Sequence, residues 1–170
     1  MLERTHAGLR NWLLAYAVGM CGMNSAVFAK PSDGEVHGNW TVRCEKQQGA
    51  EQCFIFQNLV LREGGQRVLH IAVGFLAKEP EPIALVTLPL GISLPPGVSM
   101  VVDQDGPTAK FPIERCEPKG CRGGVKLDAR ILDALKKGKE ATVTFHDAAR
   151  QPVKVPISLK GFSAGLTALH

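Results

Sequence analysis

The chain has 170 residues, of which 45% are apolar, 21% charged and 6% aromatic, and its formal net charge is +4. These values are typical of a single globular domain and exclude a collagen-like or disordered chain. The charge is too small to indicate a nucleic acid partner, because phosphate binders usually carry a denser basic face. Eighteen glycines and eleven prolines disfavour long helices and are typical of short strands joined by tight turns.

The first 29 residues have the pattern of a secretory signal peptide. Arg4 and Arg10 precede an apolar stretch over residues 12–23, and Val27 and Ala29 supply small side chains at the positions that signal peptidase reads. The pattern predicts cleavage after Ala29. Such a segment sends the protein to the periplasm or cell envelope.

Cleavage at this point leaves one mature domain, residues 30–170, with no internal repeat or linker. The alternative is an uncleaved anchor, because residues 12–29 approach the shortest length that crosses a bilayer. Asn24, Ser25 and two glycines weaken the anchor hypothesis.

Four cysteines lie in the predicted mature domain: Cys44, Cys53, Cys116 and Cys121. An even number of cysteines in an exported protein indicates disulfides. Each sequential pair flanks a short polar turn, which favours Cys44 with Cys53 and Cys116 with Cys121. Closing loops of this size stabilises the fold by about 2 to 3 kcal/mol each through chain entropy. A four-cysteine zinc site is the alternative, but the first pair is more widely spaced than zinc sites favour.

Alternation of apolar and polar residues predicts a series of short strands. We expect them over residues 36–44, 53–61, 67–77, 82–88, 98–103, 108–113, 123–127, 139–147 and 151–159. One short helix is expected between an N-capping Asp128 and a terminating Gly138. After the last strand, Phe162, Leu166 and Leu169 are expected to form an apolar C-terminal clasp. Without βαβ alternation, this pattern predicts an all-β fold, an antiparallel β-sandwich with one short α-helix.

Motifs for catalysis or metal binding are weak in this sequence. Residues 161–165 match the G-x-S-x-G pattern of a nucleophile elbow, with Ser163 as the nucleophile. That elbow needs a parallel sheet before it and an acid and a base after it, and only His170 follows at the end of the chain. The histidines are scattered singly. We therefore predict no catalytic residue, no metal and no cofactor, and a serine hydrolase using Ser163 is the less favoured alternative.

Basic residues are concentrated in one segment, residues 115–139, which holds eight basic and three acidic residues. The simplest interpretation is a solvated face that favours solubility. The alternative is a docking patch for an anionic partner, such as a lipid head group, an acidic glycan or an acidic protein surface, which would allow peripheral membrane association. The residues predicted for this patch are Arg115, Lys119, Arg122, Lys126 and Arg130.

Four fragments occur in order along the predicted mature domain, and together they carry a family resemblance. They are GNWTVRC at residues 38–44, LPLGI and LPPGV within residues 88–98, CEPKGC at residues 116–121 and ISLKGF at residues 157–162. The chain resembles the invasion-associated locus B family of exported proteins from Gram-negative bacteria. The resemblance implies an immunoglobulin-like sandwich in the periplasm or envelope and a link to the entry of bacteria into host cells. It supplies no catalytic residues.

These observations predict a non-enzymatic binding or structural module whose partner is an envelope or host component. The main alternative is a periplasmic chaperone-like or assembly factor. An unpaired sheet edge would be the sign of that alternative, because such an edge can accept a strand from a client protein.

Overall fold

The structure is a computed structural model that describes residues 31–47, 49–61, 64–76 and 79–170. The predicted signal peptide and the expected end of one strand at Ala77 lie outside the described residues. The described residues form eleven strands and two helices. The strands are β1 (Val36–His37), β2 (Trp40–Gln47), β3 (Ala50–Val60), β4 (Arg67–Gly74), β5 (Ile83–Leu88), β6 (Val98–Val102), β7 (Thr108–Phe111), β8 (Ile113–Glu117), β9 (Gly120–Lys126), β10 (Glu140–His146) and β11 (Pro152–Ser158).

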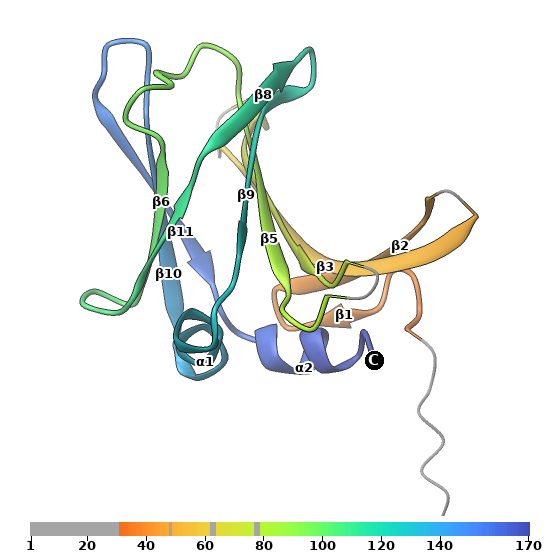
Figure 1. Cartoon of the computed structure of the whole chain (residues 1–170). Helices are drawn as coiled ribbons and strands as arrows, with labels where there is room; N and C mark the ends of the chain where they lie inside the picture. The colour runs from red at the N-terminus through yellow and green to blue at the C-terminus, as the bar shows by residue number, and fades with distance from the viewer. Residues whose placement is uncertain (1–30, 48, 62–63, 77–78) are drawn as a thin grey trace, which may run out of the picture.

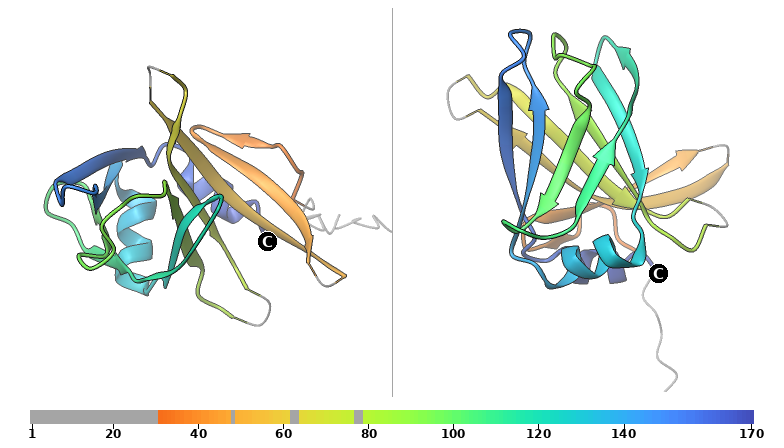
Figure 2. Two further views of the ribbon diagram at one scale, coloured as in Figure 1. Left: turned by 90° about the horizontal axis from the view of Figure 1, so that it is seen from above. Right: turned by 60° about the vertical axis from the view of Figure 1, so that its left-hand side comes forward.

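The strands form two antiparallel sheets that face each other as a sandwich (Figure 1). The larger sheet has the order β1-β2-β3-β4-β5-β9-β8, and the smaller sheet has the order β11-β10-β6-β7. The hairpin end of β2 and β3 projects beyond the body of the sandwich, as Figures 1 and 2 show. The predicted antiparallel β-sandwich is confirmed.

The core lies between the sheets because each strand turns alternate apolar side chains inward. On the larger sheet, Ile71 in β4 and Val86 in β5 are buried; on the smaller sheet, Met100 in β6 and Val143 in β10 are buried opposite them. The alternate positions face away from the partner sheet. This alternation decides which side chains are free to meet another molecule.

Two helices close one end of the sandwich (Figure 1). The helix α1 (Ala129–Lys137) begins where the Asp128 carboxylate accepts a hydrogen bond from the Ile131 amide at 2.8 Å, and it ends at Gly138. Both ends agree with the sequence prediction. The helix α2 (Phe162–Thr167) was expected only as an apolar clasp. Phe162 and Leu166 on α2 are buried in the core, so the predicted clasp exists and takes a helical form.

The structure differs from the predicted strands most clearly at two places. The strand expected over residues 36–44 breaks at Gly38 and Asn39, because Gly38 has φ +58° and the Asn39 amide donates to Lys160 instead of to a neighbouring strand. The segment around Cys116 was expected as a loop and instead forms the hairpin of β8 and β9. Its tight turn is possible because Gly120 has φ +130°.

Candidate functional site

Both disulfides join directly opposite residues of neighbouring antiparallel strands. Cys44 in β2 pairs in register with Cys53 in β3, and Cys116 in β8 pairs with Cys121 in β9. The Cα atoms are 4.0 Å and 3.9 Å apart, close enough for a direct bond between the side chains. The two predicted pairings are confirmed. Because all four thiols are oxidised, they are not available as zinc ligands.

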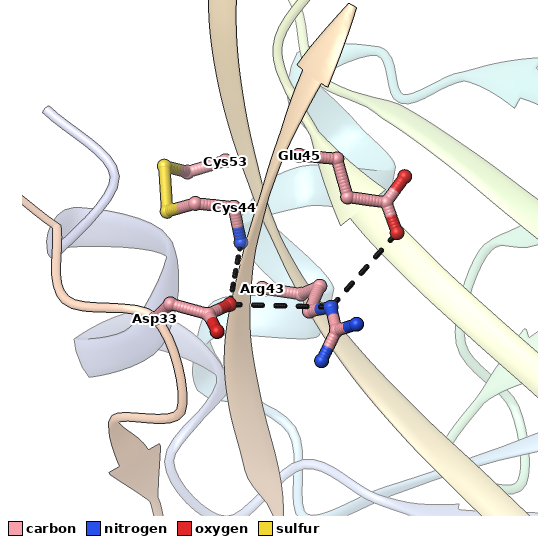
Figure 3. Close-up of polar contacts among 5 residues, drawn as sticks. All are labelled: Asp33, Arg43, Cys44, Glu45 and Cys53. Atoms are coloured by element: carbon pink, nitrogen blue, oxygen red, sulfur yellow. Dashed lines mark hydrogen bonds and ion pairs between the residues drawn. A yellow bond between two sulfur atoms is a disulfide. The ribbon is translucent and has the colours of Figure 1, made fainter.

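The Cys44–Cys53 disulfide is further held by the chain that precedes β1 (Figure 3). The Asp33 carboxylate accepts a hydrogen bond from the Cys44 amide at 2.9 Å and lies 4.0 Å from Arg43. Glu45 lies 3.9 Å from the same guanidinium. Arg43 is therefore flanked by two carboxylates, and its charge is largely compensated within the protein.

Removing the Cys116–Cys121 disulfide with the double substitution Cys116→Ser and Cys121→Ser is expected to lower the free energy of unfolding by about 2 kcal/mol, because the unfolded chain regains the freedom of a short loop. Urea denaturation of the variant and of the oxidised parent protein measures the difference. Adding a reductant should weaken the parent and leave a variant without either disulfide unchanged. An equal reductant effect on both proteins would contradict a stabilising role of the disulfides.

The first and last fragments of the family resemblance meet in the fold. The carbonyl of Ser158 accepts hydrogen bonds from the Trp40 indole at 3.1 Å and from the Gln57 amide group at 2.6 Å. The Asn39 amide donates to Lys160 at 2.9 Å. The ring centroids of Trp40 and Phe162 lie 5.2 Å apart in an edge-to-face contact. These residues tie β2 to the chain around α2, so their role here is structural.

The two middle fragments also meet each other. Leu88 at the end of β5 is the register partner of Cys121 in β9. A β-carbon at Gly120 would collide with the carbonyl oxygen of Leu88, so the hairpin can approach β5 only with glycine at this position. The contacts of all four fragments are accounted for by packing and backbone geometry.

Three of the five residues predicted for the anionic-partner patch lie together. Arg115 in β8 and Arg122 in β9 are register partners, and Lys119 lies in the turn between these strands. Arg67 on β4 joins them, since its guanidinium donates to the Lys119 carbonyl at 3.5 Å. We call Arg67, Arg115, Lys119 and Arg122 the cationic cluster. The sequence analysis missed Arg67 because it lies 52 positions before Lys119.

The cationic cluster is only partly neutralised. Arg115 lies 3.3 Å from Glu117. Among the described residues, no carboxylate lies within ion-pair distance of Arg67, Lys119 or Arg122. Arginine guanidinium groups bind carboxylate and phosphate oxygens through paired hydrogen bonds, so this group of side chains can accept an anion.

The other two predicted residues lie elsewhere. Lys126 is at the opposite end of β9, where its ammonium group contacts Glu79 at 2.8 Å. The hydrogen bond and charge of Glu79, with the charge of Glu81, raise the pKa of Lys126. Arg130 is on α1, beyond the sheet. The structure therefore does not bring Lys126 and Arg130 into the cationic cluster.

His70 lies beside the cationic cluster on β4. Its Nδ1 atom is 2.8 Å from the Asn58 side-chain oxygen, and its ring lies 5.5 Å from that of Phe56. Burial lowers the pKa of His70, and the charges of Arg67 and Arg122 lower it further. The ring is therefore uncharged at neutral pH. The uncharged His70 ring stabilises the folded protein fully above pH 6.5. This stabilisation is lost as the pH falls through the lowered pKa of His70.

The contacts of Ser163 are not those of a nucleophile elbow. Its hydroxyl donates to the Lys136 carbonyl at 3.0 Å, and it lies at the start of a short helix in an antiparallel fold. His170 packs against the Phe75 ring at 4.3 Å. Among the residues that the structure describes, no group of three or more His, Cys, Asp or Glu could hold a metal ion. Within the same ranges, no helix is long and apolar enough to cross a membrane.

These features define a disulfide-bonded β-sandwich domain with a cationic cluster at one end of its larger sheet. The profile of the Invasion associated locus B (IalB) protein family matches residues 40–170, and the chain belongs to this family. Invasion protein B homolog from Brucella abortus (strain 2308) is 36% identical over 134 residues, which cover 78% of this chain and 76% of the relative.

Two further comparisons agree with this family membership. Invasion protein B from Bartonella bacilliformis is 27% identical over 138 residues, covering 79% of this chain and 73% of the relative. A crystal structure of invasion associated protein b from Bartonella henselae superimposes with a TM-score of 0.72 at 27% identity, covering 81% of this chain and 95% of that chain. The predicted resemblance to the family is confirmed.

Proposed function

We propose that this protein is an exported, non-enzymatic binding module of the cell envelope, associated with invasion as its relatives' names indicate, and that it docks an anionic partner through the cationic cluster. The observation that carries the proposal is the convergence of Arg67, Arg115 and Arg122 from three strands, joined by Lys119 from a turn. Like charges placed next to each other destabilise a fold slightly. A negatively charged partner would relieve this repulsion, and the relief would favour binding.

Export by a cleaved N-terminal segment, with cleavage after Ala29, is part of this proposal. Two disulfides between adjacent strands support it, because disulfides form and persist in oxidising compartments such as the periplasm. The basic and apolar character of residues 4–29 supports it as well.

The experiment is retention of the protein on isolated envelopes at increasing salt. In the variant Arg67→Glu with Arg122→Glu, retention at low salt should fall by more than about 30-fold, since each basic residue near an anionic surface is worth about 1 kcal/mol and reversing its charge also adds repulsion. The matched control is Lys110→Glu with Lys154→Glu. It changes the net charge by the same amount, but on the outer face of the smaller sheet.

Circular dichroism of both variants checks that they fold. Retention that is equally reduced in the control, or unchanged in the cluster variant, would contradict the proposed docking site. Export has its own measurement: the N-terminal residue of the envelope-extracted protein should be Lys30, and its four cysteines should not react with a thiol reagent until they are reduced.

The chaperone-like alternative receives less support from the sheet edges. β1 is two residues long, β7 four and β8 five, and β11 contains Pro152 and Pro156. Short edges and prolines hinder the addition of a foreign strand.

A further inference from the structure

The outer face of the larger sheet is turned away from the smaller sheet (Figure 1). This face carries a band of apolar residues. One row of register partners runs Phe56, Ala72, Leu85 and Gly124 across β3, β4, β5 and β9. The outer face of an antiparallel sheet is normally polar, because it meets water. Leu85 nevertheless leaves 51% of its surface exposed at the middle of this face.

Small residues beneath the large side chains give this band its form. A β-carbon added at Gly124 would lie 2.8 Å from the Cδ2 atom of Leu85, and one added at Gly74 would lie 2.8 Å from the Cβ atom of Phe54. The Leu85 side chain therefore extends over Gly124, and β3 at Phe54 approaches Gly74 closely. The rings of Phe54 and Phe56 lie 6.4 Å apart. We call Phe54, Phe56, Leu85 and the neighbouring Ile83 the apolar band.

The cationic cluster adjoins the apolar band on the same face. The next row of register partners is Asn58, His70, Thr87 and Arg122, two positions along each strand from the row of Leu85. Two strand positions correspond to about 7 Å. On the other side of the Leu85 row, Lys126 is the register partner of Ile83, and its charge is neutralised by Glu79. Among the described residues of these rows, the charge without an ion-pair partner thus lies along one border of the band.

This arrangement favours one kind of partner over the others. A second copy of the chain would bring two apolar bands together but would also add its own positive charges to the interface. An acidic glycan would pair with the arginines but would leave Leu85 and Ile83 against a polar surface. An anionic membrane offers both phosphates and acyl chains, and amphipathic faces bury about 5 to 10 Å into the boundary between them. If the strands are inclined to the membrane, the separation of about 7 Å along the sheet places the apolar row deeper than the cationic row.

We propose that the outer face of the larger sheet docks obliquely on an anionic lipid membrane, with the apolar band at the acyl boundary and the cationic cluster at the headgroup phosphates. This inference rests on the proposed function, because it identifies the anionic partner of the same cluster. The His70 ring packs against Phe56 at the border between the two rows.

The test is sedimentation of the processed, envelope-extracted protein with vesicles of phosphatidylglycerol and phosphatidylcholine, compared with phosphatidylcholine alone. Binding should occur on the anionic vesicles and weaken with salt. Arg67→Gln with Arg122→Gln should reduce it about 30-fold, from about 1 kcal/mol for each charge. Leu85→Ser should reduce it about tenfold, because a half-exposed leucine loses its apolar contact.

Two control variants match these changes elsewhere on the surface. Leu94→Ser alters a leucine that is 46% exposed in the connection between the sheets, and Lys110→Gln with Lys154→Gln removes two charges from the smaller sheet. Both controls should bind vesicles as the parent does. All variants keep the same N-terminus, so any contribution from that region is equal throughout.

The outcomes separate this inference from the proposed function. Absence of vesicle binding, or binding that Leu85→Ser leaves unchanged, would overturn the membrane proposal. If the protein still binds envelopes through Arg67 and Arg122 but does not bind vesicles, its partner is an acidic protein or glycan, and the proposed function stands. Envelope binding that is the same in the parent and in the cluster variant would refute the proposed function itself.

Discussion

Replacing Phe162 with alanine is expected to lower the free energy of unfolding by about 3 to 5 kcal/mol, the range for large aromatic residues removed from a core. Phe162 is 1% exposed and makes the edge-to-face contact with Trp40, which is itself 1% exposed. The substitution leaves a cavity between β2 and α2 and removes an aromatic pair. Urea denaturation followed by tryptophan fluorescence measures the loss, because Trp40 reports directly on this contact.

Leu90→Ala is the control for the effect of Phe162→Ala. Leu90 is 55% exposed, and its truncation should change stability by less than about 0.5 kcal/mol, as for an ordinary surface position. A small domain has a total stability of only about 5 to 15 kcal/mol, so the loss expected for Phe162→Ala is a large share of the whole. Equal stability of the two variants would show that α2 does not belong to the cooperative core.

Gly161→Ala is expected to destabilise the protein by about 3 kcal/mol or more, for two independent reasons. Gly161 has φ +89°, a conformation that costs a residue with a β-carbon about 1 to 2 kcal/mol. The new β-carbon would also collide with the carbonyl oxygen of His37 and lie 2.8 Å from the Gly38 nitrogen. Both neighbours are backbone atoms, which cannot rotate away as a side chain can. Thermal or urea unfolding monitored by far-ultraviolet circular dichroism measures the effect.

Gly91→Ala separates the two causes. Gly91 has φ +85°, close to that of Gly161, but a β-carbon there would meet nothing within 4 Å. Its substitution should therefore carry only the conformational cost of about 1 to 2 kcal/mol. If Gly161→Ala were no worse than Gly91→Ala, the close approach of β1 to the start of α2 would not be required for folding.

The features that the sequence predicted well depend on residues close together in the chain. The Asp128 cap, the end of α1 at Gly138 and both disulfide pairings arise within ten residues or fewer. The hairpin of β8 and β9 was missed because charged residues and Pro118 hide the alternation that marks a strand. The break at Gly38 was missed although its signal is local, since Gly38 and Asn39 form the two-residue turn between β1 and β2.

The candidate site shows the same division between local and distant information. The basic segment was visible, but its five predicted residues fall on β8, β9, their turn and α1. Only the pairing of Arg115 with Arg122 and the register of β4 with β5 and β9 reveal which side chains share a face. The hydrogen bond that joins Arg67 to the cluster and the position of His70 beside it depend on pairing between strands that are distant in the sequence. The apolar band was also hidden, since the alternate positions of β4 and β5 are apolar on both faces, as in a buried strand.

The close approach of β1 to α2 has a practical consequence for how this domain can be attached to other structures. The backbone at Gly38 lies against that at Gly161, near the two ends of the described chain. A short peptide could therefore join the ends and allow new termini to be opened in the exposed connection around Gly91. A protein attached ahead of Pro31 or after His170 would therefore lie near the end of the sandwich that the two helices close (Figure 1).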